Sequence, residues 1–404
     1  MNINKLYYYF VLLAAFILPL SRASASIFVA VSIALFLFNI KAYSQYIKFF
    51  KEYKLAQALL LLMFYKLISL MWTENIETGL YTKILYIEWI AIFALGFYLK
   101  KEQVFSVISA FIAGMFISEL ISYGMYFHIL HLSSARGCDS SHFMISISYS
   151  IFLAVVSIFL LNRILSKKYN YKEKIFYLIF FFTATGNLFI SNGRTGQLAF
   201  FIAFFITFFI HFRLNIKTII ASSIFVSLII AVAYNTFPNN FANRINLAKR
   251  DINYVLHRNY NTSLGLRAAM YIVSYDCFKK EPILGAGIGD YEQAPRYALK
   301  NNNHHFAKRV IKFISTHHLH SQFLHEVVSG GLIALFLLLY IYYQLFRLPI
   351  ENKELKELSV LFGIIYLVGS IPEPLLIKQF PSTLFILFMG LFLAASKRID
   401  FENS

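Results

Sequence analysis

Apolar runs recur along the whole chain and are separated by short polar stretches, a pattern typical of helices that cross a lipid bilayer. A helix needs about 20 mostly apolar residues to span roughly 30 Å of hydrocarbon. On this criterion we predict twelve membrane-spanning helices. They cover residues 6–21, 24–40, 55–72, 84–99, 104–130, 142–161, 175–191, 196–212, 218–237, 322–345, 358–371 and 380–396.

The composition agrees with this pattern. The chain is 58% hydrophobic and 14% charged, with a mean hydropathy of +0.62, whereas soluble proteins are about a quarter charged. The apolar run after Lys5 is similar to a signal peptide, but its length and the spans that follow favour a retained first helix. We therefore predict an all-α polytopic membrane protein whose helices form one bundle.

The distribution of lysine and arginine predicts the orientation, because short cytoplasmic loops are enriched in them. With the N-terminus inside, the short segments on the cytoplasmic side hold 19 basic residues and the short external loops hold five. Both termini then lie in the cytoplasm. Most of the net charge of +17 follows from this asymmetry, so the charge does not imply a nucleic-acid partner.

One long external stretch, residues 238–321, separates the ninth and tenth predicted spans. It holds twelve Lys and Arg residues against five Asp and Glu residues, and long loops are exempt from the orientation rule. A basic external loop beside a membrane suggests an anionic partner, either lipid headgroups or a phosphorylated substrate. We therefore predict three regions: spans one to nine in residues 1–237, a loop with the binding and catalytic residues in 238–321, and the last three spans with a cytoplasmic C-terminus in 322–404.

Three external arginines are candidate binding residues. The segment SLGLRAAMYIVSYDCFKK predicts an amphipathic helix with Ser263 as N-cap, and Arg267 lies in its first turns. The apolar stripe of this helix consists of Leu266, Met270, Val273 and Cys277. Arg194, in the short loop SNGRTGQ, lies near the bilayer boundary, where an arginine is costly unless it is paired or faces a polar cavity. Arg136, in ARGCDSSH, is a secondary candidate; contacts with lipid phosphates would explain all three without a substrate.

Three histidines crowd into THHLHS at residues 316–321, directly before the tenth predicted span. A metal site here would draw on His317, His318, His320 and His325, together with His304 and His305. Glu326 follows His325, but the second histidine that HExxH spacing requires is absent, so we predict no metal. By residue type alone, histidines at a polar membrane interface are the simpler explanation.

Several other motifs are absent or incomplete. GAGIGD lacks the third glycine and the preceding strand of a dinucleotide-binding turn, and the chain has no P-loop and no GxSxG sequence. Many glycosyltransferases that use lipid-phosphate sugars bind a metal through an Asp or Glu in the first external loop. The first external loop of this chain, SRASAS, holds no such acid. Cys138 and Cys277 are too few for a disulfide framework, and they form one bridge or remain free thiols. We expect no cofactor.

Four stretches together resemble the O-antigen ligases and their relatives, the O-antigen polymerases and O-linked oligosaccharyltransferases. They are SNGRTG, SLGLRAAMY, EPILGAGIGDY and HSQFLHEVVSGGLIA. The last contains His320, Ser321 and Gly331 at the spacing of the family pattern, with Ala334 in place of the usual Gly, Thr or Tyr. The number of predicted spans and the late external loop are also similar to the family.

This resemblance implies an inverting, metal-independent glycosyl transfer at the periplasmic face of a bacterial inner membrane. The donor would be a glycan on undecaprenyl diphosphate, with its tail among the membrane helices, and the acceptor a sugar hydroxyl of lipid A–core. A neutral imidazole can take the hydroxyl proton, and guanidinium groups can hold the departing diphosphate. We therefore expect His320 to act as the base, His318 to orient it or to contact substrate, and Arg194 and Arg267 to bind the diphosphate.

Two other functions stay open. A polymerase of the same family would use the same donor with a second lipid-linked glycan as acceptor, although the loop helix SLGLRAAMY is more similar to the ligases. A transporter of lipid-linked oligosaccharides would use the arginines only for binding. Transporters place ionisable groups near the middle of several spans, and Lys66 and Glu119 are the only clear cases in this sequence.

Overall fold

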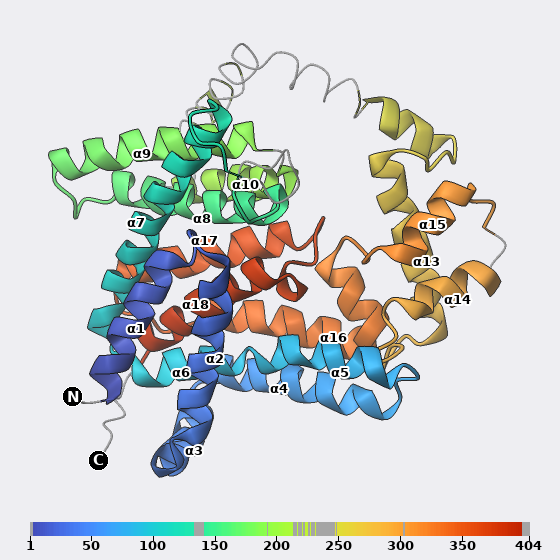
Figure 1. Ribbon diagram of the computed structural model, residues 1–404, viewed down its shortest axis with the longest axis horizontal. Coiled ribbons are helices and arrows are strands. Elements are labelled where there is room, and N and C mark those ends of the chain that lie inside the picture. The colour runs from blue at the N-terminus through green and yellow to red at the C-terminus, as the bar shows by residue number, and fades with distance from the viewer. Residues whose placement is uncertain are drawn as a thin grey trace.

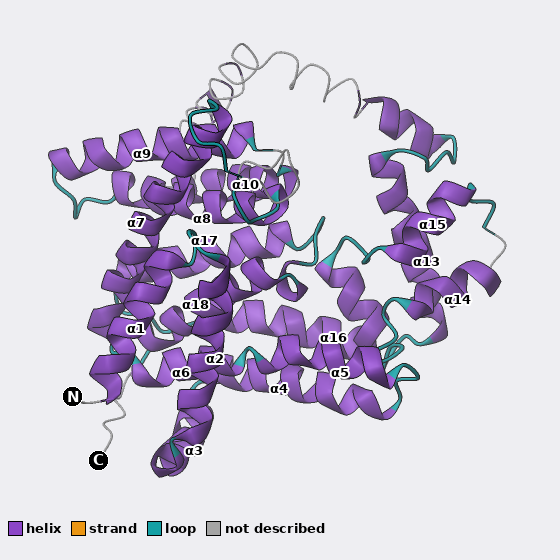
Figure 2. Cartoon of the chain, viewed as in Figure 1, coloured by secondary structure: helices purple, strands orange, loops and turns teal. Residues whose placement is uncertain are grey.

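The computed structural model describes residues 3–132, 141–191, 193–212, 249–301 and 304–397, with a few isolated positions between residues 213 and 248. All regular secondary structure in these ranges is helical (Figure 2), so the predicted fold class is confirmed for them. The helices are α1 (Ile3–Ile17), α2 (Arg22–Phe38), α3 (Tyr43–Glu52), α4 (Lys54–Ile68), α5 (Ile76–Ile87), α6 (Ile90–Tyr98), α7 (Lys101–Tyr126), α8 (Ser146–Leu165), α9 (Tyr171–Ile190), α10 (Arg194–His211), α13 (Ser263–Lys280), α14 (Gln293–Asn301), α15 (Lys308–Thr316), α16 (Gln322–Phe346), α17 (Lys353–Gly369) and α18 (Gln379–Ala395), with 3-10 turns at Ile40–Ala42, Ser69–Met71 and Leu375–Ile377.

Seven of the described helical segments are long and apolar enough to cross a membrane, or eight if the pair Arg22–Phe38 and Ile40–Glu52, bent by 66°, is one span. The protein is therefore a multi-pass membrane protein by the composition of its helices. On this criterion the structure supports seven or eight of the twelve predicted spans, and the others stay predictions. Helices α1 and α18 have only 15 and 17 residues, α17 begins with a charged turn, and the span predicted at 218–237 falls largely on residues that the structure does not describe.

The side chains of helices α8 and α18 are almost all buried in the bundle. Helix α8 packs against α9, α10 and α17, and α18 packs against α6. Helix α10 approaches α8 closely because Gly193 and Gly196 face Ser150, where a Cβ on either glycine would lie 2.2 Å from an atom of that serine. The two glycines of SNGRTG therefore fix the start of α10, and with it Arg194, against α8.

Helices α13, α14 and α15 pack together at one end of the molecule, beside the first half of α16 (Figure 1). The apolar stripe predicted for α13 is buried, and part of it forms a small core with α15. The predicted N-cap, Ser263, is wrong by one residue. The side chain of Thr262 caps the helix instead, and it accepts a hydrogen bond from the backbone N–H of Gly265 at 3.1 Å.

Helix α16 is broken at Gly331, where φ is 61° and ψ is −157°. Such a break leaves carbonyls at the end of the first half, and N–H groups at the start of the second half, without helical partners. Segment 282–287 supplies the missing partners through four backbone hydrogen bonds. They join Ala286 N to Val328 O (2.9 Å), Gly287 N to Ser329 O (3.1 Å), Leu332 N to Pro282 O (2.9 Å) and Ile333 N to Ile283 O (3.4 Å).

The stretch EPILGAGIGDY, residues 281–291, contains this segment and packs its backbone directly on the membrane helices. Gly285 has a φ of 67°, and a Cβ there would lie 2.4 Å from the backbone nitrogen of Gly331. Near the end of this stretch, the carboxylate of Asp290 accepts the backbone N–H groups of Glu74 and Asn75 at 2.7 and 3.0 Å. EPILGAGIGDY therefore holds the loop against α16 and against the turn between α4 and α5, and this structural role of its glycines needs no nucleotide.

Candidate functional site

His320 lies at the junction of α15 and α16, one residue before Ser321, the N-cap of α16. Its φ of 44° is uncommon for a residue other than glycine. The imidazole stacks parallel to Phe313, with ring centroids 5.7 Å apart, and the backbone N–H donates to Nδ1 of His318 at 3.3 Å. These contacts fix a side chain that is 17% exposed, at the end of the bundle where α13 and α15 lie.

A carboxylate that the sequence did not reveal, Glu373, faces His320. It lies between two prolines in the turn from α17 to α18, and its side chain is fully buried. Oε1 of Glu373 lies 3.2 Å from Nδ1 of His320 and 3.7 Å from Nη2 of Arg267, and Oε2 lies 2.6 Å from Nζ of Lys378. An imidazole, a guanidinium and an ammonium therefore converge on one carboxylate where α13, the start of α16 and the α17–α18 turn meet.

The groups around Glu373 keep it ionised. Burial by itself would raise the pKa of Glu373, but the hydrogen bond from His320 and the charge of Lys378 outweigh burial and lower the pKa to about 2. An ionised carboxylate can only accept hydrogen bonds, so Nδ1 of His320 carries the hydrogen and donates it. In the neutral ring, Nε2 then keeps a free lone pair, and this is the tautomer that can act as a base.

His318 is the immediate neighbour of this pair, with its ring centroid 4.4 Å from that of His320. Burial lowers the pKa of His318 to about 3, and the positive charge of Lys378 adds to the effect. The ring is therefore neutral at pH 7. It contributes no charge to the site, and it helps to hold the backbone of His320 in its unusual conformation.

The three residues His318, His320 and Glu373 offer ligand atoms within 4.8 Å of one another, an arrangement that could hold a metal ion. However, Lys378 already places an ammonium group 2.6 Å from the carboxylate. A divalent cation at this point would have to displace that charge or be repelled by it. The charges therefore fit a metal poorly, and metal-free chemistry stays a prediction.

The remaining histidines of the predicted cluster lie elsewhere. His317 is exposed and stacks on Phe313, the ring that also contacts His320, with centroids 4.3 Å apart. His304 pairs with Asp276 on α13 at 2.5 Å. His325 is buried one turn inside α16. Of the crowded histidines, His318 and His320 are therefore the two that share a site with Glu373.

Arg267 projects from α13 towards this site and is 31% exposed. Its contact with Glu373 is longer than a hydrogen bond, so its fork of N–H donors is not committed to that carboxylate. Arg194 is exposed in the first turn of α10. The next residue, Thr195, lies against Gly369, where α17 ends and the turn with the buried carboxylate begins. Both predicted arginines thus lie at the same end of the molecule as His320.

Two predictions fall on residues outside the described ranges. Arg136 and Cys138 belong to the segment 133–140, so the secondary role of the arginine and the pairing of the cysteine stay predictions. Cys277 is described, and it packs against Leu319 and Val328. Burial raises the pKa of its thiol to about 12, which makes it a poor nucleophile.

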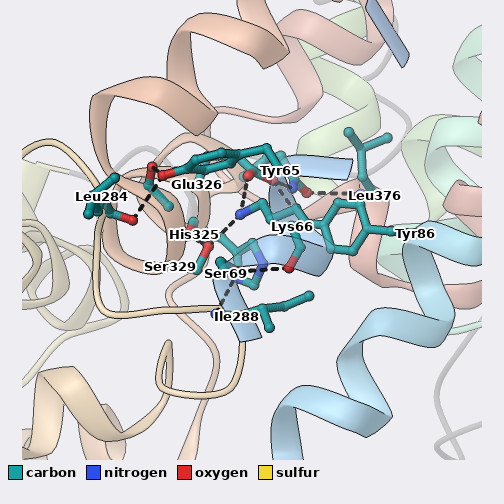
Figure 3. Close-up of polar contacts among 12 residues, drawn as sticks. Tyr65, Lys66, Ser69, Tyr86, Leu284, Ile288, His325, Glu326, Ser329 and Leu376 are labelled. Carbon is teal, nitrogen blue, oxygen red and sulfur yellow. Dashed lines mark hydrogen bonds and ion pairs between the residues drawn. The ribbon is translucent and has the colours of Figure 1, made fainter. Parts of the chain in front are cut away.

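A second polar cluster lies inside the bundle, one turn into α16 (Figure 3). Lys66 of α4 and Glu326 of α16 form an ion pair with Nζ and Oε2 2.5 Å apart, and both side chains are buried. Tyr86 and Gln322 donate to Oε1 of the glutamate at 3.2 and 2.8 Å, and Lys66 also donates to Oγ of Ser329 at 2.6 Å. The sequence pointed to Lys66 as an ionisable residue in a span, but it did not identify the partner.

Comparison with known proteins supports the sequence resemblance. Residues 179–339 match the protein-family model described as O-antigen ligase. An uncharacterised protein of Haemophilus influenzae is 35% identical over 134 residues, which cover 32% of each of the two chains. The O-antigen ligase of Escherichia coli K12 is 28% identical over 123 residues, 30% of this chain and 29% of that protein. The matched part of the chain spans about a third of the length of these curated relatives.

The region that matches the family model begins in α9 and ends in α16. It includes Arg194, Arg267 and His320, whereas Lys66 and Glu373 lie outside it. Residues 179–339 therefore carry a domain of the O-antigen ligase family, within a multi-pass helical membrane protein that is distantly related to the O-antigen ligase of Escherichia coli.

Proposed function

We propose that this protein is an O-antigen ligase, an inverting and metal-independent glycosyltransferase of the bacterial inner membrane. It moves a glycan from undecaprenyl diphosphate to a sugar hydroxyl of lipid A–core. The observation that carries the proposal is the pairing of His320 with buried Glu373 at 3.2 Å, beside the guanidinium of Arg267. This transfer needs three groups in one place: a base, a carboxylate that orients the base, and a group that binds anions.

In the proposed reaction, Nε2 of His320 takes the proton of the acceptor hydroxyl while its oxygen attacks the anomeric carbon. The new carbon–oxygen bond forms on one face, and the bond from the anomeric carbon to the diphosphate oxygen breaks on the other, so the configuration inverts. The diphosphate leaves with the bonding electron pair, and Arg267 and Arg194 hold the resulting charge. Glu373 stabilises the imidazolium until its proton passes to water.

The way the loops group together supports the periplasmic placement of this site. Segments predicted to be external meet one another, as in the contact of Asp290 with the backbone of Glu74. Segments predicted to be cytoplasmic also meet, as in the ion pair of Lys168 with Glu354. With 19 basic residues on the cytoplasmic side and five in the short external loops, the end that carries His320 is assigned to the periplasm.

Two alternatives are less well supported. A polymerase would use the same donor and the same base, and only the acceptor would differ. A transporter would need free ionisable groups inside the bundle, but Lys66 is paired with Glu326 at 2.5 Å, and Glu119 accepts a hydrogen bond from Thr183 at 2.6 Å. The similarity of the loop helix SLGLRAAMY to the ligases favours the ligase.

Deletion of the gene, followed by gel analysis of lipopolysaccharide, separates these functions. A ligase predicts bare core together with accumulated lipid-linked polymer, whereas a polymerase predicts core that carries a single repeat. Unchanged lipopolysaccharide would rule out both.

In purified protein, His320→Gln should slow transfer by about 10² to 10⁴-fold, because general-base help is worth that much. His317→Gln is the matched control, since it alters an exposed histidine that stacks on the same phenylalanine. Chelation by EDTA should leave the rate unchanged, and rescue of an EDTA-treated enzyme by zinc would contradict the metal-independent reaction.

A further inference from the structure

The buried ion pair of Lys66 and Glu326 is joined by hydrogen bonds to the turn between α17 and α18. Gln322 is the link, because its Nε2 donates to Oε1 of Glu326 at 2.8 Å and its Oε1 accepts the backbone N–H of Leu376 at 3.0 Å. The backbone N–H of Gln322 also donates to the carbonyl of Ser370 at 2.9 Å. Residues 370 and 376 lie on either side of Glu373, the carboxylate that faces His320, so Gln322 holds the turn at both ends.

We propose that Lys66, Glu326 and Gln322 are positioning residues for the transfer. The ion pair fixes Gln322, Gln322 fixes the turn, and the turn holds Glu373 against Nδ1 of His320. The inference rests on the proposed function, because it assigns the buried cluster a part in the same reaction. None of the three residues touches the substrate in this scheme.

The charge of Glu326 determines which way the amide of Gln322 faces. An ionised carboxylate can only accept, so the amide nitrogen must point to Glu326, and the amide oxygen is then turned to the N–H of Leu376. The opposite orientation would set the amide oxygen against the carboxylate and the amide N–H against the backbone N–H. Both contacts would be repulsive, so the carboxylate selects a single orientation.

A buried ion pair within a span is a costly way to gain stability. Replacing such a pair by apolar residues of similar volume is often neutral or stabilising, and ionisable groups inside membrane helices are expensive. In this cluster, the contacts instead fix the orientation of the Glu326 carboxylate. Lys66 binds one carboxylate oxygen, and Tyr86 and Gln322 bind the other, so the carboxylate cannot rotate without losing a partner.

Two variants test the link in the full-length protein in detergent. Gln322→Met removes the connection and leaves the ion pair in place, and Glu326→Gln removes the charge that orients the amide. Ser329→Ala is the control, because it removes another hydrogen bond of Lys66 that does not lead to the turn. The first readout is the ¹⁵N NMR signal of the His320 ring, identified by its loss in His320→Gln. It needs no substrate, so it is independent of the proposed reaction.

We expect the hydrogen of His320 on Nδ1 in the natural protein and in Ser329→Ala, and a mixture of the two tautomers in Gln322→Met and Glu326→Gln. Where transfer is measured, kcat should fall about 10 to 100-fold, since a displacement of about 1 Å can cost that much. KM for the donor should stay the same, because the two arginines are not part of the link.

Natural tautomer and natural kcat in Gln322→Met would overturn the proposal. So would parallel changes of kcat and KM in all three variants, which would indicate a general loss of structure. If Glu326→Gln fails to fold, Gln322→Met still decides the question. An altered tautomer in a protein that transfers no glycan would support the positioning role and contradict the proposed function.

Discussion

Replacing Glu373 with glutamine keeps the size of a fully buried side chain and removes its charge. The glutamine has one acceptor oxygen, whereas the carboxylate has one for Lys378 and another for His320. We expect the lysine to take that oxygen, because its full charge forms the stronger hydrogen bond. The amide N–H₂ would then face Nδ1 of His320 and require the tautomer with hydrogen on Nε2, which has no lone pair for the substrate.

The effect of this substitution on stability follows from the pKa of Glu373, which is lowered from 4.5 to about 2. A difference of that size corresponds to roughly 3 kcal/mol in favour of the carboxylate, at about 1.4 kcal/mol per pKa unit. Because the pKa in the folded protein is lowered, this stabilisation is fully present above pH 4.5 and is lost as the pH falls towards 2. Glu373→Gln should therefore destabilise the protein by about 3 kcal/mol at pH 7 and by little at pH 2.

The assay is glycan transfer by purified protein, with thermal unfolding in detergent measured on the same sample. Transfer should fall by about 10² to 10⁴-fold, because a base held in the wrong tautomer loses most of its effect. Glu351→Gln is the matched control. It makes the same change at a carboxylate that is 82% exposed and 3.3 Å from Lys101, and its effect on stability should stay within about 0.5 kcal/mol. Natural transfer rates in Glu373→Gln would refute the assigned role of this carboxylate.

Three further predictions concern the arginines, the stretch EPILGAGIGDY and the orientation. Arg267→Ala and Arg194→Ala should each abolish transfer while the protein is still produced at normal levels. Lysine at either position should restore little activity, because a point charge cannot reproduce the guanidinium fork. Full activity of both alanine variants would indicate that these arginines only contact lipid. Gly285→Ala should destabilise the protein by about 2 to 4 kcal/mol, since its φ is 67° and a Cβ would lie 2.4 Å from backbone, and an unchanged melting temperature would contradict this close packing. Reporter fusions after Tyr254 should signal the periplasm and fusions after Lys168 the cytoplasm, and the reverse result would place the site on the wrong side for its donor.

Sequence reasoning located the residues of the site that belong to recognisable motifs. His320 and Arg267 stood out because a crowded histidine stretch and a loop helix each form a local pattern, and the structure brings them to one carboxylate. Glu373 does not stand out in the sequence because it comes 53 residues after His320, in a different turn. A signal was present, since an acid between two prolines at the end of an apolar run has to find a partner when it is buried.

The membrane helices show where the hydrophobic pattern is insufficient. The pattern identified most of the described helices but missed α3, α5, α14 and α15. Apolarity alone also does not decide whether a short helix such as α1 crosses the membrane. Lys66 stands out as an ionisable residue in an apolar run, whereas Glu326 follows His325 directly and invites comparison with the HExxH motif, whose second histidine is absent, rather than with a charge on another helix. Opposite charges in two apolar runs are a stronger sign of pairing between helices than either residue alone.

The broken helix α16 has a consequence for how this protein is made. The carbonyls of Val328 and Ser329 and the N–H groups of Leu332 and Ile333 find their partners in residues 282–287, which leave the ribosome before α16 does. Lipid offers no replacement for these hydrogen bonds. The first half of α16 can therefore settle in the membrane only when the preceding loop has already folded onto it. Insertion of this span and folding of the loop are therefore coupled in the biogenesis of the protein. A loop that folds late leaves unpaired backbone groups of α16 exposed to the bilayer and to membrane proteases.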